Sequence, residues 1–398
     1  MRRVATALAL AATALASCGD GAPPRPGTAR YLDDPAYRRA EMLASLTTTD
    51  NDYARLRIAR YDSGDARDWS ALPPWNPPAA PLAPGAPATR PLDLGPADPD
   101  ALRALGEAAF SRYPAMLASP AVEATLRRPG AAARYGFWTA ADGAPGGVVG
   151  VVLAGGVLGL AYSCATCHSA RGSDGALVAG LANGALDLGA LVADSDPTLP
   201  HTQDATLRRW GPGRVDVTTA EGREPIAIPD LRPVREQLYL QRSGAVRRRS
   251  VVSLAIRIET LLITAHGEAV RPPREVALGL ALYLDSLADS LPAPREGVAG
   301  AGVFTARCAG CHAPPTYGGG LVPAGEVGTD PALARSPTRG TGSYRVPSLR
   351  GVGARARLFH DGSAAGLDAL LGPAQAHPMG LDLSATEATA LRTYLDAL

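Results

Sequence analysis

The sequence predicts a mainly α protein built from two similar units in tandem, the first with a β-hairpin insertion, preceded by a proline-rich segment. Three observations support this prediction. A five-residue Cys/His motif occurs twice, each unit ends in a nearly identical helical sequence, and prolines concentrate before residue 95. A chain of 398 residues is also long enough for two domains.

The N-terminus has the pattern of an export signal. Arg2 and Arg3 precede an apolar run that is too short to span a bilayer. The run ends in Leu-Ala-Ser-Cys18, which resembles the lipobox of bacterial lipoproteins, where the cysteine is acylated. We therefore expect residues 1–17 to be a lipoprotein signal peptide and Cys18 to be lipidated, placing a membrane-anchored protein on the periplasmic or cell-surface side. An ordinary signal cleaved nearby, with Cys18 free, is the alternative.

The proline-rich segment covers residues 18–95. Pro-Pro pairs occur three times in it, and such composition favours extended, semi-rigid chain over a packed core. We expect a tether with short helices around Pro35–Leu46 that lifts the remaining chain off a membrane.

An internal repeat divides the rest of the chain at about residue 292. The helical sequences Tyr283–Leu287 and Tyr394–Leu398 differ at one position, and the same register pairs His266 with His377. At the front of the units, Gly106 precedes Phe110 and Gly300 precedes Phe304 at helical spacing. A glycine lets two helices cross closely, so we expect the first and last helices of each unit to cross there.

The repeated motif is C-x-x-C-H, at Cys164, Cys167 and His168 and again at Cys308, Cys311 and His312. This is the attachment pattern of c-type haem, in which the thiols form thioethers and the histidine is the proximal iron ligand. A zinc site would draw ligands from two separated pairs, and a thioredoxin-like dithiol would follow a strand in a βαβ unit. We therefore expect two covalently bound haem c groups, in cytochrome c-like domains at 96–292 and 293–398.

The sixth iron ligand decides whether each haem is closed or open to small molecules. For the second haem the candidates are His377, Met379 and His360, with His377 favoured by its repeat partner. For the first haem, His266 holds the matching position in the repeat, His201 is an alternative, and an open iron is the third possibility.

The sequence between Gly146 and Tyr162, rich in Val and Leu, predicts a β-hairpin that leads into the first motif.

The segment 345–368 resembles the C-terminal haem domain of the bacterial di-haem cytochrome c peroxidase superfamily. The resemblance rests on Arg-Val-Pro-Ser-Leu-Arg-Gly-Val at 345–352, Leu-Phe-His-Asp-Gly-Ser at 358–363 and Leu-Asp at 367–368, and it is looser across 130–290. It implies class I cytochrome c-like domains and places His360 near the haem edge between them. The peroxidases carry a displaceable histidine soon after the first motif, whereas no histidine occurs between His168 and His201 here.

Other side chains are candidates for contact with haem. Arg214 suits a propionate because guanidinium recognises carboxylate bidentately, and Trp210 suits a position between the haems. A surface ion pair and ordinary core packing are the alternatives. Arg242 with Arg247–Arg249 is the one local basic run, suited to a solvated turn, an acidic redox partner or a propionate.

The composition limits the function. The chain has no Lys, and its 39 arginines nearly balance 38 acidic residues, so nothing favours nucleic-acid binding. We expect a di-haem c-type cytochrome that transfers single electrons between redox proteins or small electron donors and acceptors. The alternative is a di-haem peroxidase or oxygenase that reacts at the first haem and uses the second as an electron relay.

Overall fold

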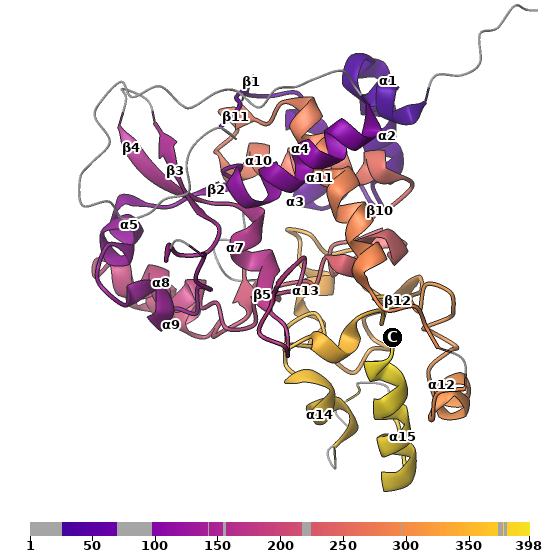
Figure 1. The fold of residues 1–398 in the computed structure, drawn as a ribbon. Coiled ribbons are helices and arrows are strands. Elements are labelled where there is room, and N and C mark those ends of the chain that lie inside the picture. Colours follow the sequence, from indigo (N-terminus) through magenta and orange to yellow (C-terminus); the bar gives the residue numbers. More distant parts are fainter. Residues whose placement is uncertain are drawn as a thin grey trace, which may run out of the picture.

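The computed structural model describes residues 26–69, 98–141, 143–153, 157–216, 224–295, 297–372, 377 and 380–398. Of these, 43% are helical and 13% lie in strands, which form one three-stranded and five two-stranded sheets. The signal peptide, Cys18, most of the proline-rich segment and Met379 lie outside the described residues. Figure 1 shows the C-terminal helices, in yellow, below the remainder of the chain.

The N-terminal segment 26–69 is folded against the first unit. It forms α1 (Gly27–Asp33), α2 (Pro35–Ser45) and α3 (Asp52–Arg60), followed by β1 (Asp65–Ala66), which pairs in parallel with β11 (Val270–Arg271). The hydroxyls of Tyr31 and Tyr61 both donate to the buried carboxyl group of Glu259, at 2.9 Å each. The predicted short helix around Pro35–Leu46 is confirmed as α2, but residues 26–69 do not form a free tether, because their apolar and tyrosine side chains pack against α10 (Val251–Ala265).

The first unit is built on a close crossing of two helices, α4 (Pro99–Arg112) and α11 (Arg274–Ser286), which Figure 1 shows side by side. A Cβ atom at Gly106 would lie 1.9 Å from the carbonyl oxygen of Gly279. Next to this contact, the rings of Phe110 and Tyr283 pack with centroids 5.4 Å apart. The predicted crossing of first and last helices is confirmed, and glycine is required because backbone meets backbone.

Replacing Gly106 by Ala is expected to destabilise the protein by more than about 3 kcal/mol, since the helices must separate to admit one methyl group. Urea unfolding of the purified protein measures the effect. Gly302 is the matched control: it is helical, and nothing lies within 4 Å of its virtual Cβ. Ala there is expected to stabilise by up to about 0.5–1 kcal/mol. Equal effects at the two sites would contradict this account of the crossing.

The predicted hairpin is present and leads directly into the first motif. Strands β3 (Val148–Val152) and β4 (Leu158–Tyr162) pair antiparallel, and β2 (Met116–Leu117) adds to the outer edge of β4. β4 is buried along most of its length, and α7 (Cys164–His168) begins two residues after it ends. The sheet therefore holds the first motif against the core.

The remaining elements of the first unit are short. They are α5 (Pro120–Leu126), α6 (Ala131–Arg134), β5 (Ser169–Arg171), β6 (Leu177–Ala179), α8 (Leu188–Ser195), α9 (His201–Arg208), β7 (Arg214–Val215), β8 (Ile226–Ala227), η2 (Arg232–Glu236), β9 (Tyr239–Leu240), β10 (Val246–Arg247) and η3 (Leu287–Ser290). Three antiparallel pairs, β5 with β6, β7 with β8 and β9 with β10, stabilise the connections.

The second unit repeats the helix crossing of the first. Gly300 caps α12 (Ala301–Arg307), and a Cβ atom there would lie 2.1 Å from the carbonyl oxygen of Ala390 in α15 (Ala385–Asp396). Phe304 packs on Tyr394 with ring centroids 4.9 Å apart, as Phe110 packs on Tyr283. The other elements are β12 (Leu321–Pro323), α13 (Ala332–Arg335), β13 (Ser343–Arg345), η4 (Val352–Ala354) and α14 (Gly366–Leu371).

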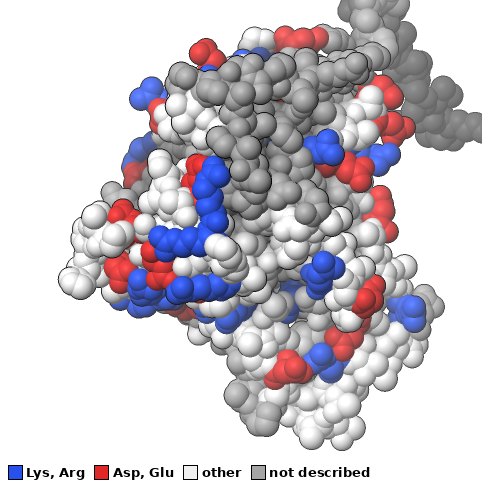
Figure 2. Space-filling model, turned by 60° about the vertical axis from the view of Figure 1, so that its left-hand side comes forward, with Lys and Arg blue, Asp and Glu red and all other residues white. Residues whose placement is uncertain are grey.

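The surface carries charges of both signs. Figure 2 shows arginine side chains beside aspartate and glutamate on the face in view. On α9, for example, Arg208 pairs with Asp194 at 2.7 Å and with Asp204 at 3.0 Å. Among the described residues, no helix is long and apolar enough to cross a bilayer.

Candidate functional site

The first motif lies on α7, and neighbouring main chain fixes it on several sides. The backbone amides of Asn183 and Gly180 donate to the carbonyls of Cys167 and His168, at 2.9 and 2.7 Å. The Trp138 indole donates to the Ala165 carbonyl at 3.0 Å. Trp138 therefore positions the turn that carries both thiols. Cys164 and Cys167 are not joined to each other, and burial raises the pKa of their thiols to about 11 and about 12.

The imidazole of His168 is prepared to act as a metal ligand. Its Nδ1 lies 2.9 Å from the carbonyl oxygen of Pro229, and because a carbonyl only accepts, Nδ1 carries the proton. Burial lowers the pKa of His168 to about 4, so the ring is neutral at physiological pH. The lone pair is then on Nε2, as an axial haem ligand requires.

The second motif is a turn that follows α12. The amide of Cys308 donates to Phe304 at 2.8 Å, and the amide of His312 donates to Cys308 at 2.9 Å. Nδ1 of His312 lies 3.2 Å from the carbonyl of Tyr317 and 3.1 Å from that of Pro347. Burial lowers the pKa of His312 to about 4, so this ring also presents an unprotonated Nε2.

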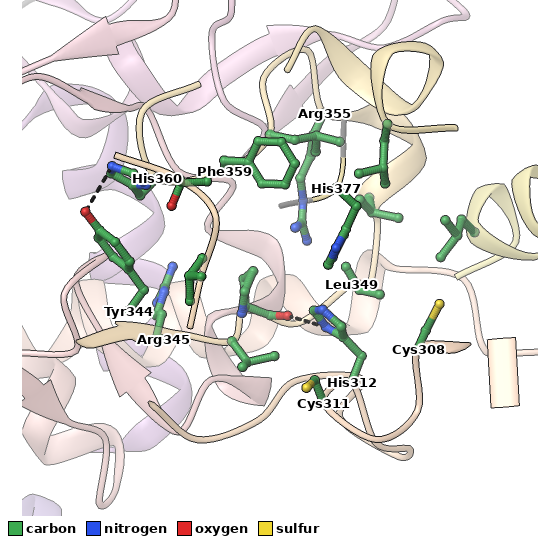
Figure 3. Close-up of a pocket in the computed structure, with 18 of the residues that line it drawn as sticks. Cys308, Cys311, His312, Tyr344, Arg345, Leu349, Arg355, Phe359, His360 and His377 are labelled. Atoms are coloured by element: carbon green, nitrogen blue, oxygen red, sulfur yellow. Dashed lines mark hydrogen bonds between the residues drawn. The ribbon is translucent and has the colours of Figure 1, made fainter. Parts of the chain in front are cut away.

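A cavity of about 410 Å³ opens beside the second motif. This volume falls within the range of small-molecule and cofactor sites, ~300–1,000 Å³. Apolar side chains of α14, α15 and the segment 346–352 form much of its wall, and the segment 228–230 of the first unit closes one side. Figure 3 shows His312, with Cys308 and Cys311 beside it, at one edge of this space. The cavity therefore lies where the two units meet.

His377 lies across the cavity from His312. Figure 3 shows its ring directed at His312, and its proximity contributes to the lowered pKa of His312, after burial. Phe359 packs edge-on against His377 with centroids 6.2 Å apart. The backbone of Phe359 is left-handed, with φ of 67°, an uncommon conformation for an aromatic residue that turns its side chain into the site. The structure thus brings together the favoured pair of ligands for the second motif.

His360 lines the same cavity at another position. Its ring stacks on Tyr344 with centroids 4.2 Å apart, and its Nε2 lies 3.2 Å from the Tyr344 hydroxyl. That hydroxyl already donates to the Asp330 carbonyl, at 2.5 Å, so Nε2 of His360 is the donor. This hydrogen bond holds His360 at the wall, away from the gap between His312 and His377 (Figure 3).

Three partly buried arginines line the cavity, and the sequence analysis named only one of them as a candidate for contact with haem. Arg242 donates to the Ala227 carbonyl, Arg345 to the Tyr239 carbonyl and Arg355 to Asp230. Burial, and after it the proximity of neighbouring arginines, lowers the pKa of Arg242 to about 10 and that of Arg345 to about 9. Arg345 is the first residue of the segment 345–368 that carries the family resemblance, and this position could have marked it as a candidate site residue.

Arg214 connects main chain of the two units. Its guanidinium donates to the carbonyl oxygens of Trp210, Asp361 and Gly362, at 2.7, 2.5 and 3.1 Å. Arg214 is not among the residues that line the cavity beside the second motif, and its contact with a propionate stays a prediction. Trp210 is 5% exposed and packs in the apolar core around α8, apart from the cavity lining, as the packing alternative predicted.

The candidates for a sixth ligand at the first motif have partners elsewhere in the structure. Nε2 of His266 donates to the Pro114 carbonyl at 3.0 Å, and its ring packs against Trp69. His201 is exposed at the start of α9. Neither forms a hydrogen bond or ring contact with the first motif among the described residues, and the assignment of His266 by its place in the repeat stays a prediction. Met379 lies outside the described residues.

The residues present fit haem c better than the alternatives. In the described part of the chain, no three His, Cys, Asp or Glu side chains converge, whereas structural zinc needs four ligands. Haem c needs two thiols and one neutral imidazole per site, and both motifs supply them. Comparison with known proteins adds nothing to this assignment, since no family model and no curated protein matches the chain.

Proposed function

We propose that this protein is an exported, lipid-tethered c-type cytochrome with two covalent haem groups, and that it transfers single electrons between redox partners. Cys164 with Cys167, and Cys308 with Cys311, would hold the haems, and His168 and His312 would be their proximal ligands. One observation carries the proposal: His312 and His377 face each other across a cofactor-sized cavity beside the second pair of thiols.

The chain's own groups would control the iron in three ways. The carbonyls of Pro229, Tyr317 and Pro347 fix the tautomers of the proximal histidines, which sets ring orientation and ligand basicity. The apolar wall excludes water and keeps reorganisation small during electron transfer. A second imidazole from His377 would close the second iron, which favours electron transfer over binding of small molecules. Bound haem supplies the redox-active iron.

The direct test is expression of the full chain in a host equipped for cytochrome maturation. We expect a red protein whose mass exceeds that of the mature polypeptide by two haem groups, with the colour surviving denaturation because thioethers are covalent. The mass spectrum of the mature protein also shows whether Cys18 is acylated. A colourless product with unmodified thiols would overturn the proposal.

A di-haem peroxidase or oxygenase is the second candidate, and one observation favours it. All six histidines are among the described residues: His360 and His377 line the cavity beside the second motif, His266 bonds Pro114 and His201 is exposed, so each of the four has a place other than a contact with His168. A first iron without an imidazole on its distal side could bind peroxide or oxygen. A high-spin signal from the first haem together with turnover of hydrogen peroxide would favour this candidate. Two low-spin haems without turnover would favour the carrier.

A further inference from the structure

The cavity wall carries an excess of partly buried positive charge. Five arginines and one carboxylate, that of Asp230, line it. Asp230 is already shared, because it accepts from Arg232 at 2.7 Å and from Arg355 at 3.3 Å. Arg242 and Arg345 form no ion pair with any described carboxylate, and Nε of each is buried without a hydrogen-bond partner. Buried cations are normally paired, so these two require an anion that the polypeptide does not supply.

The geometry of the cluster selects the kind of anion. Figure 3 shows Arg345 and Arg355 extending into the same space from opposite sides, on the side of the cavity away from Cys308. Arginine forks match planar carboxylates, and two neighbouring cations suit a ligand that presents two carboxylates from one edge. Cys308 and Cys311 fix the opposite end of such a ligand. A haem held through its vinyl groups presents its two propionates in this way.

We propose that Arg242, Arg345 and Arg355 form the propionate site of the second haem, and that Asp230 holds Arg355 in it. This inference rests on the proposed function. Pro229, whose carbonyl accepts the proton of His168, directly precedes Asp230. The propionate edge of the second haem would therefore face the first motif, with the segment 228–230 between them, and electrons would pass between the haems at this edge.

The test is potentiometric titration of the holoprotein, with the second haem identified as the one absent from the Cys308→Ser, Cys311→Ser variant. Arg345→Met removes a cation that favours the reduced iron. At an effective dielectric constant near 20 and about 10 Å, we expect roughly a tenfold fall in the equilibrium constant for reduction, or about 59 mV. Asp230→Asn removes the opposing anion, is nearly isosteric, and is expected to raise the potential.

Arg392→Met is the matched control. Arg392 lies on α15, whose Leu391 and Leu395 line the cavity, but its guanidinium points outward to Asp396 at 2.7 Å. This variant is expected to leave the potential unchanged. Shifts of opposite sign in the Arg345 and Asp230 variants support the inference, because general damage to the fold would not produce them. A holoprotein in which both variants leave the potential unchanged, or shift it in one direction, overturns the inference. Absence of haem from the unmodified chain would instead overturn the proposed function.

Discussion

Replacing Cys308 and Cys311 together by Ser is expected to remove one of the two haem groups. Without thiols the second site can hold haem only through coordination by histidine. Some of this haem is expected to dissociate during purification, and the rest on denaturation. Pyridine haemochrome absorbance per polypeptide should fall to about half, since each C-x-x-C-H motif carries one haem. The mass should fall by one haem group in the same preparation.

The same variant is expected to lose stability in the second unit. The core of that unit surrounds the cavity, with Leu381, Leu391 and Leu395 among its members, and a bound ligand stabilises only the folded state. Limited proteolysis should therefore cut within 293–398 before it cuts the first unit. The control is the Cys164→Ser, Cys167→Ser variant, which should lose the other haem and leave the C-terminal unit resistant. Full haem content in either double variant would contradict the assignment.

Replacing His377 by Ala is expected to convert the second haem from six-coordinate low-spin to five-coordinate high-spin iron. The cavity contains two histidines besides His312, and His360 is held at the wall by Tyr344, so no other described imidazole can take the vacated position. Electron paramagnetic resonance of the oxidised protein should lose one low-spin signal and gain a high-spin one. Added imidazole should restore the low-spin signal, because it can enter the space left by the side chain.

Two controls accompany the His377 variant. His360→Ala should keep the second haem low-spin, although the loss of the Tyr344 contact alters the cavity wall. His201→Ala, at an exposed site on α9, should change neither haem. If His377→Ala stays low-spin while Met379→Ala becomes high-spin, the ligand is the methionine. That result would also predict a higher potential, because thioether ligation raises it.

Patterns confined to a few neighbouring residues were sufficient to predict much of the fold. The hairpin over 148–162 followed from β-branched runs, and the two helix crossings followed from a glycine four residues before a phenylalanine. The residues of each motif form a local turn, whereas the carbonyls that their histidines bond through Nδ1, those of Pro229 and Pro347, come from distant segments. The hairpin and the positions of the glycines follow from the local sequence, because short-range sterics and residue spacing encode them.

The sequence by itself therefore determined the two Cys/His motifs, the repeated helix crossing and the hairpin. Only the tertiary structure decided which side chains meet. His266 and His377 hold equivalent places in the repeat, yet the first bonds Pro114 and the second faces His312. The N-terminal helices, the hydrogen bonds of Arg214 and the arginines around the cavity likewise depend on contacts between distant segments. Such contacts are fixed by the packing of whole helices and strands, and patterns of neighbouring residues do not predict that packing.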